Sequence, residues 1–315
     1  MNPYLFIVGC PRSGTTLLRH ILMAHPQITI TPESHWIPIW FEERRGLTPE
    51  GMVTPELIDL LLDHPRFARL RIRREQLAGL MGNGHPLSYS AFVTAILDLY
   101  GKRKHKLLVG DKTPQYVRRM RTLHSLWPRA HFVHLIRDGR GVWLSVANWS
   151  KTPQTRLARL STWKDDPVST TALWWESNVR QGRESGKSLG PGLYYEVRYE
   201  CLVARPQEEC SALCTFLGVP YDEAMLRFHE GHKRSDLTSR GKGNWLPWRP
   251  VVTGLRDWRT QMSSDDVERF EAIAGDLLNE LAYPRAFPRL RPERLEDASR
   301  IRAWVVKTAE PEASR

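Results

Sequence analysis

The sequence has few cysteines and no long apolar run. Its 315 residues include four cysteines, none of them in a C-x-x-C pair, so neither a disulfide scaffold nor a zinc finger is indicated. No stretch approaches the roughly 20 apolar residues of a membrane span, and the N-terminus lacks the basic start and the apolar length of a signal peptide. We therefore expect a cytoplasmic protein without a transmembrane segment or a bound metal.

The sequence also lacks internal repeats and low-complexity linkers. Its apolar fraction of 41% and charged fraction of 26% are typical of a globular protein. We expect a single domain over residues 1–291, with a helical insertion at about 37–104. A loop at about 231–256 is rich in Gly, Pro, Arg and Trp, and the C-terminal tail, 292–315, is expected to be either a peripheral helix or partly disordered.

Acidic residues are outnumbered by basic ones, which gives a formal net charge of +11 at pH 7. A basic protein favours anionic partners such as nucleotides, acidic peptides, acidic glycans or nucleic acid. No nucleic-acid-binding motif accompanies the basic residues, so we do not expect a nucleic-acid partner.

Four short apolar runs alternate with helical patterns along the chain. The runs cover residues 4–8, 106–109, 131–136 and 193–197, and polar or glycine-rich segments follow each of them. This alternation predicts an α/β fold of the P-loop type, with a parallel β-sheet flanked by helices. In such folds ligands bind at the carboxyl ends of the strands, so we expect the polar segments to meet there.

The segment GCPRSGTT, residues 9–16, matches the phosphate-loop pattern G-x-x-x-x-G-K-[ST] except that Thr15 replaces the lysine. Backbone N–H groups in such a loop, at the start of a helix, bind an anion without that lysine. A nucleoside triphosphatase uses the lysine on its β- and γ-phosphates. The loop therefore suits a ligand with a single 5′-phosphate, for which Arg12 supplies the positive charge.

Two segments together resemble the nucleotide signatures of sulfotransferases that use 3′-phosphoadenosine 5′-phosphosulfate (PAPS) as the sulfuryl donor. They are PRSGTT, at 11–16, and FVHLIRDGRGVWLSV, at 132–146. The resemblance implies that Arg137 and Ser145 bind the 3′-phosphate. It implies contacts with the 5′-phosphosulfate for Arg12, Ser13, Gly14, Thr15 and Thr16. Each segment alone has a structural alternative, a turn for the first and a helix start capped by Asp138 for the second.

Over about residues 3–283 the chain is most similar to tyrosylprotein sulfotransferases and their bacterial relatives. TPESHWIP, at 31–38, resembles the segment with the catalytic base and implies that role for Glu33. GDKTP, at 110–114, implies that Lys112 assists transfer. VRYECLVARP, at 197–206, implies that Tyr199 packs on the adenine, although a core aromatic residue is an equal alternative.

Two positions depart from the pattern of this branch. His35 stands where the branch has an arginine, which leaves His35 as an alternative base. In GLRDWR, residues 254–259, Asp257 stands where we expect a basic residue of a nucleotide-closing loop. Arg256, Arg249 or Lys242 could replace that residue, and we favour Arg256.

The resemblance implies transfer of a sulfuryl group, without a metal, to a hydroxyl of a peptide tyrosine, glycan, lipid or small molecule. Two alternatives stay open, a P-loop nucleotide kinase or other phosphotransferase and a non-catalytic nucleotide- or anion-binding module. Six tryptophans could stack on an acceptor or be part of the core. They are Trp36, Trp40, Trp174, Trp175, Trp245 and Trp248.

Overall fold

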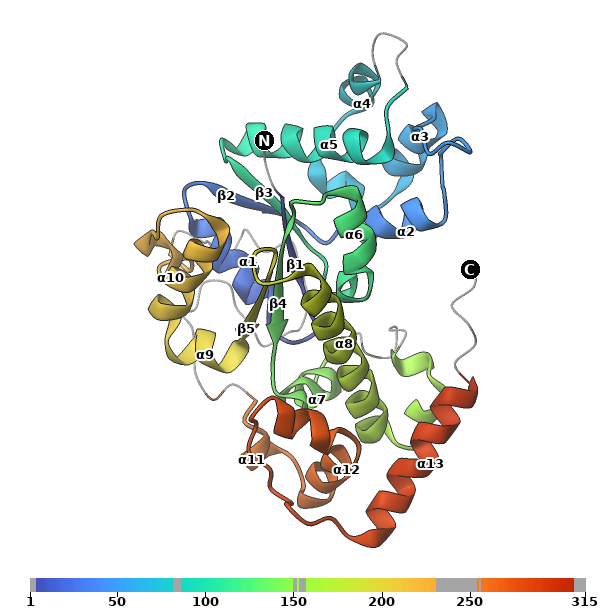
Figure 1. The fold of residues 1–315 in the computed structure, drawn as a ribbon, viewed down its shortest axis with the longest axis vertical. Coiled ribbons are helices and arrows are strands. Elements are labelled where there is room, and N and C mark those ends of the chain that lie inside the picture. Colours follow the sequence, from blue (N-terminus) through green and yellow to red (C-terminus); the bar gives the residue numbers. More distant parts are fainter. Residues whose placement is uncertain are drawn as a thin grey trace.

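A parallel five-stranded sheet forms the centre of the protein in a computed structural model, which describes residues 4–81, 86–149, 152, 157–230, 254 and 256–308. The strands lie in the order β2-β3-β1-β4-β5 (Figure 1). They are β1 (Leu5–Val8), β2 (Ile28–Thr31), β3 (Leu108–Lys112), β4 (His131–Ile136) and β5 (Tyr194–Arg198). The predicted α/β fold with a parallel sheet is confirmed.

Strand β2 was not predicted, and β3 begins and ends later in the sequence than predicted. β2 has only four residues, ITIT, all of them buried. β3 was expected to end at Val109, but its pairing with β1, in which Ile7 lies opposite Lys112, extends the strand through Gly110 and Asp111. Lys112 is therefore the last residue of the strand instead of part of a loop after it.

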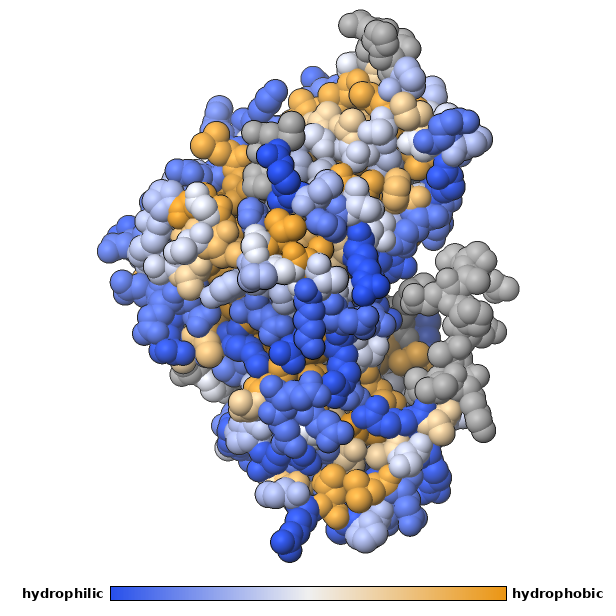
Figure 2. All heavy atoms as spheres, viewed as in Figure 1, coloured by the Kyte–Doolittle hydropathy of each residue, from blue (hydrophilic) through white to orange (hydrophobic). Residues whose placement is uncertain are grey.

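Helices cover both faces of the sheet (Figure 1). Leu5 and Ile7 of β1 pack with one face, which bears α1 (Thr15–Ala24), α9 (Tyr199–Ala204) and α10 (Pro206–Leu217). Phe6 and Val8 point to the other face, where η2 (Pro114–Arg119), α6 (Met120–Leu126) and α8 (Pro167–Leu189) lie. Hydrophilic side chains cover most of the surface over α8 (Figure 2).

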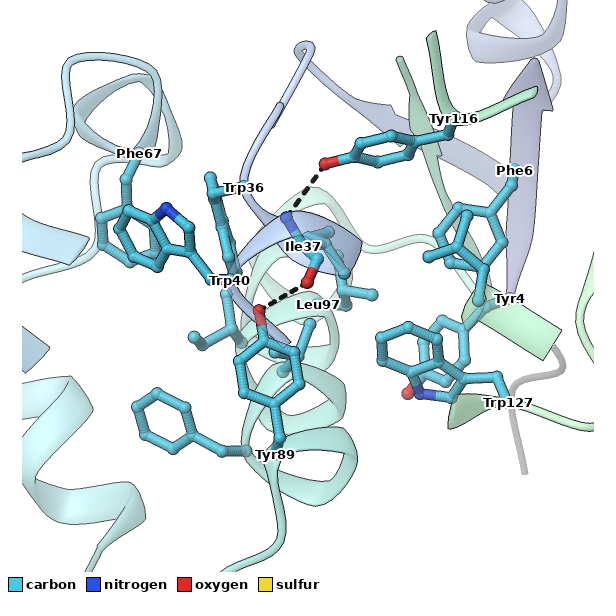
Figure 3. Close-up of a cluster of buried hydrophobic side chains, with 14 of the residues drawn as sticks. Tyr4, Phe6, Trp36, Ile37, Trp40, Phe67, Tyr89, Leu97, Tyr116 and Trp127 are labelled. Atoms are coloured by element: carbon cyan, nitrogen blue, oxygen red, sulfur yellow. Dashed lines mark hydrogen bonds between the residues drawn. The ribbon is translucent and has the colours of Figure 1, made fainter. Parts of the chain in front are cut away.

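The predicted helical insertion lies between β2 and β3 and forms the upper tier of Figure 1. It contains α2 (Ile37–Glu42), α3 (Pro55–Asp63), η1 (Phe67–Leu70), α4 (Arg74–Leu80) and α5 (Tyr89–Lys104). Figure 3 shows its aromatic core against the sheet. Within it, the Tyr116 hydroxyl accepts a hydrogen bond from the backbone N–H of Ile37 at 3.0 Å, and the Tyr89 hydroxyl donates to the Ile37 carbonyl at 2.7 Å.

The lower tier of Figure 1 contains the segments that follow β4 and the C-terminal helices. They are α7 (Gly139–Ala147), η4 (Leu157–Arg159), η5 (Ser161–Trp163), α11 (Trp258–Gln261), α12 (Ser264–Glu280) and α13 (Pro292–Thr308), while η6 (Glu223–Met225) follows α10. The expected loop at 231–256 lies almost entirely outside the described residues. Of the two alternatives predicted for the tail, a peripheral helix or partial disorder, the structure shows the helix. This helix is α13, which extends to residue 308.

Some of the tryptophans that could stack on an acceptor are part of the core instead. Trp36, Trp40 and Trp175 are buried, as are Cys210 and Cys214 on α10. Trp174 is partly buried against the same cluster as Trp175, whereas Trp245 and Trp248 lie outside the described residues. No helix in the part of the chain that the structure describes is long and apolar enough to cross a membrane.

Candidate functional site

Each strand of the sheet leads directly into a candidate site segment. Because all five strands are parallel, their carboxyl ends lie on one edge of the sheet. The segments there are the glycine loop 9–16 after β1, Glu33 after β2, Lys112 at the end of β3, Arg137 after β4 and Tyr199 after β5. The edge of the sheet thus brings together residues that are far apart in the sequence.

The glycine loop leads into α1 without a side-chain cap. Gly14 is the N-cap residue, with φ 103°, and among the described residues no side chain caps the first amides of the helix. These N–H groups, at the positive end of the helix dipole, are suited to an anion. A Cβ atom at Gly14 would come within 2.6 Å of the Tyr199 ring, so the close packing of Tyr199 on the loop requires glycine here.

The carboxylate of Glu33 is surrounded by three basic side chains. Lys112 Nζ lies 2.5 Å from Oε1, while His35 Nε2 and Arg66 Nη1 lie 3.0 Å and 3.2 Å from Oε2. Lys112 Nζ also donates to Thr16 Oγ1 at 3.3 Å. Lys112 therefore connects the carboxylate to the glycine loop.

This arrangement keeps Glu33 ionised. Burial acts to raise the pKa of Glu33, but the hydrogen bond with His35 and the charge of Lys112 outweigh burial and hold the pKa well below its ordinary value. Burial lowers the pKa of Lys112, and the charge of Glu33 opposes this. At neutral pH Glu33 is a carboxylate that can accept a proton.

Hydrogen bonds between β2 and β3 hold the segment around Glu33. Thr31 Oγ1 donates to Asp111 Oδ2 at 2.7 Å. Ser34 donates its backbone N–H to Thr113 Oγ1 at 3.0 Å, and its hydroxyl lies 2.7 Å from the Tyr116 hydroxyl. These bonds fix the residues on both sides of Glu33 relative to Lys112.

A second basic cluster surrounds Ser145 on α7. Arg12 Nε donates to Ser145 Oγ at 3.1 Å, and Arg256 Nη1 donates to the same oxygen at 2.6 Å. The Arg137 guanidinium lies over the Tyr199 ring, 4.2 Å from its centroid. Burial, together with the nearby charges of Arg256 and Arg137, lowers the pKa of Arg12 to about 10. Several positive charges held this close form a site for an anion.

The structure confirms the capped helix start in the RDGR segment, whereas binding of a 3′-phosphate by this segment stays a prediction. Asp138 is the N-cap of α7 and accepts a hydrogen bond from the Arg140 N–H at 2.9 Å. The same turn places Arg137 at the end of β4 and Ser145 within the helix. The capped helix start therefore positions the basic cluster.

Asp257 does not belong to the basic cluster. Its carboxylate accepts a hydrogen bond from the Arg259 N–H at 3.1 Å and caps α11. Arg256, the residue we favoured at this position, contacts Ser145, whereas Arg249 and Lys242 lie outside the described residues.

Three residues of the site have left-handed backbone conformations. The φ angles of Arg12, His35 and Arg256 are 76°, 60° and 61°. Non-glycine residues adopt this conformation infrequently, and such strain is concentrated at functional sites.

Two contacts of the site were not predicted from the sequence. Arg66, from the insertion, bonds to Glu33, and Trp149 lies under the Arg12 guanidinium, 4.5 Å from it. Neither residue belongs to a recognisable motif, so only their positions in the fold reveal them. Among the described residues, no group of three or more His, Cys, Asp or Glu side chains is placed to hold a metal ion.

Known proteins are similar to this chain in sequence and fold. A model of the sulfotransferase family matches residues 3–223. The nodulation protein NoeE of Sinorhizobium fredii is 30% identical over 308 residues, which cover 93% of this chain and 68% of NoeE. Protein-tyrosine sulfotransferase A of Caenorhabditis elegans is 26% identical over 291 residues, or 91% of this chain and 69% of that protein.

Solved structures agree with these sequence relatives. The sulfotransferase domain of the Synechococcus PCC 7002 olefin synthase has a TM-score of 0.57 and 28% identity, covering 90% of this chain and 95% of the domain. The sulfotransferase domain from the curacin biosynthetic pathway has a TM-score of 0.61 and 22% identity, covering 90% and 99%, and shows the same fold. With its parallel sheet, glycine loop and family match, the chain belongs to the sulfotransferase family.

Proposed function

We propose that this protein transfers a sulfuryl group from PAPS to an acceptor hydroxyl. The observation that supports this most strongly is the position of Lys112, which is bonded both to the Glu33 carboxylate and to Thr16 of the glycine loop. A proton acceptor thereby lies beside an anion-binding loop. Transfer of a group from a bound anion to a hydroxyl requires these two features side by side.

The residues at the sheet edge fit the donor. Ser13 Oγ and Arg256 Nε are buried and have no hydrogen-bond partner among the described residues. Such orphaned polar groups are costly unless a ligand satisfies them. We assign the 5′-phosphosulfate to Arg12 and to the loop, residues 13–16. The 3′-phosphate is assigned to Arg137, Ser145 and Arg256, and the adenine to Tyr199.

PAPS supplies a sulfuryl group on a good leaving group, adenosine 3′,5′-bisphosphate. In the proposed reaction a bond forms between the acceptor oxygen and sulfur while the bond from sulfur to the nucleotide phosphate oxygen breaks. Glu33 takes the hydroxyl proton, and Lys112 and Arg12 offset the negative charge on the departing phosphate. No metal takes part in this proposal.

The acceptor belongs to one of four classes, a peptide tyrosine, a glycan, a lipid or a small molecule. Several relatives, among them the one from Caenorhabditis elegans, are named protein-tyrosine sulfotransferases. A phenol, with a reference pKa of about 10, is more acidic than an alcohol and suits a carboxylate base. Incubation with sulfur-labelled PAPS and one representative of each class would identify the acceptor.

Calorimetric titration tests the donor site directly. We expect adenosine 3′,5′-bisphosphate to bind well and ATP with magnesium to bind weakly. The Arg137→Ala variant should lose at least about tenfold in bisphosphate affinity, because a charge-assisted contact contributes about 1.5–3 kcal/mol. Arg121→Ala is the matched control, since Arg121 is an exposed arginine of α6 that pairs with Glu184.

Other outcomes of this titration support the alternatives. Preference for ATP with magnesium would indicate a nucleotide kinase. Weak binding of both nucleotides, with salt-dependent binding of polyanions instead, would indicate a non-catalytic anion-binding module.

A further inference from the structure

Arg140 is completely buried beside the basic cluster, yet it contacts no group that is assigned to the donor. It is the second residue of α7, three residues after Arg137 and five before Ser145. Its guanidinium forms two bonds with the Asp138 carboxylate, from Nε at 3.0 Å and from Nη2 at 2.7 Å. This two-pronged contact fixes the plane of the guanidinium at the start of the helix.

The other side of the guanidinium is bound to the C-terminal part of the chain. Arg140 Nη1 donates to Glu271 Oε1 of α12 at 2.6 Å, and Nη2 donates to the Pro284 carbonyl at 2.9 Å. Glu271 is fully buried and also accepts bonds from Arg285 Nε at 2.8 Å and from the Ala286 N–H at 2.9 Å. Both buried charges are thus compensated, so Arg140 is a structural cation and is not available to bind an anion itself.

The indole of Trp258 stacks on the face of the Arg140 guanidinium. The two groups stack with 3.6 Å between the guanidinium carbon and the ring centroid. Trp258 begins α11, two residues after Arg256, whose side chain reaches Ser145. The backbone therefore links the stacking partner of Arg140, Trp258, to Arg256, and the Arg256 side chain returns to Ser145 on the same helix as Arg140.

We propose that Arg140 and Trp258 are positioning residues that hold Arg256 against Ser145 and thereby set the selectivity of the site for a nucleotide with a ribose 3′-phosphate. The charges of neighbouring arginines oppose this placement, since burial and the charge of Arg137 lower the pKa of Arg256. Stacking of Trp258 on the buried Arg140 guanidinium, which is paired with two carboxylates, offsets that repulsion. The inference rests on the proposed donor, because the 3′-phosphate is the group that Arg256 would bind.

Two nucleotides that differ only in the 3′-phosphate provide the test. Adenosine 3′,5′-bisphosphate and adenosine 5′-monophosphate would be titrated by calorimetry into the wild-type protein and into Trp258→Leu, which keeps every hydrogen bond of Arg140. We expect the bisphosphate affinity to fall about tenfold or more while the monophosphate affinity changes less than about twofold, because only the 3′-phosphate pocket moves.

Trp143→Leu is the matched control. Trp143 lies on α7, the helix of Arg140, and is partly buried against the cluster that contains Trp175. The centroids of the Trp143 and Trp163 rings are 6.4 Å apart. This variant should lose stability and retain the wild-type ratio of the two affinities.

A second variant covers the case in which Trp258→Leu does not fold. Arg140→Lys retains the charge but loses the bidentate bond to Asp138 and the planar stack on Trp258. It should therefore also reduce the ratio of the bisphosphate affinity to the monophosphate affinity. A high wild-type ratio that survives in the folded variants, or an equal fall for both nucleotides, would overturn the inference alone. A wild-type ratio near one would overturn the proposed donor and this inference together.

Discussion

At the scale of single residues, the roles of Glu33 and Lys112 are the most direct test of the chemistry. Glu33→Gln removes the proton acceptor and preserves the size of the side chain. We expect turnover, at saturating donor and acceptor, to fall about 10²–10⁴-fold, which is the usual contribution of a general base. The affinity for adenosine 3′,5′-bisphosphate should change little, because the basic cluster at Ser145 is untouched.

Glu42→Gln is the control for this substitution. Glu42 is an acidic residue of α2 that bonds to Arg119 at 2.8 Å and to Thr122 at 2.7 Å, on the outside of the insertion. If His35 is the base instead, Glu33→Gln will retain most of the turnover and His35→Asn will lose it.

Residue positions at the sheet edge were predictable wherever they depend on a short motif. The glycine loop and Arg137 stand next to apolar runs, so a local pattern is enough to find them. Arg66 is different, because it reaches Glu33 across 33 positions of sequence only when the insertion has folded against the sheet. The environment of Asp257 was likewise decided by its use as a helix cap.

At the scale of elements, the connection between β2 and α2 determines where Glu33 lies. The Tyr116 hydroxyl bonds to both Ser34 and the Ile37 N–H. Tyr116→Phe should therefore lower the stability by about 1–3 kcal/mol, because buried partners lose their bonds, and should also lower kcat through displacement of Glu33. Chemical denaturation and steady-state kinetics would measure the two effects.

Tyr89→Phe is a matched control for Tyr116→Phe. It removes another buried hydroxyl that bonds to Ile37, but at the Ile37 carbonyl, on the opposite side of Ile37 from Tyr116 (Figure 3). Equal losses of kcat in the two variants, at similar stability, would contradict a specific role for Tyr116.

Strands were harder to predict than helices at this scale. The helix Pro206–Leu217 begins with a proline and has helical periodicity, and both of these are local signals. β2 is four residues long and shows no distinct boundary, and the end of β3 depends on its pairing with β1. Register between strands is a property of the sheet and not of one segment.

At the scale of the whole molecule, a buried histidine links stability to pH. His134 on β4 is fully buried, and its Nδ1 lies 2.7 Å from the Tyr194 hydroxyl, which donates to Glu196 at 2.9 Å. Burial lowers the pKa of His134 from 6.5 to about 4. Below pH 6.5 the unfolded chain binds a proton that the folded protein does not, so this contribution to stability is complete above pH 6.5 and is lost as the pH falls.

Between pH 4 and 6.5, we expect His134 alone to increase the folding equilibrium constant by nearly tenfold for each unit that the pH rises. Urea denaturation at several pH values would show a shallower pH dependence for His134→Gln than for the wild-type protein. His105→Asn, at an exposed residue with φ 53°, should retain the wild-type slope. Identical slopes for His134→Gln and the wild-type protein would contradict the linkage.

The sequence alone determined the fold class, the glycine loop and the alternation of apolar runs with helices, because these features depend on neighbouring residues and on periodicity. Only the tertiary structure decided how the strand ends meet. It placed Lys112 between Glu33 and Thr16, and Arg256 beside Ser145. These contacts join segments that are distant in the sequence, and they form only when the parallel sheet brings the carboxyl ends of its strands to a common edge.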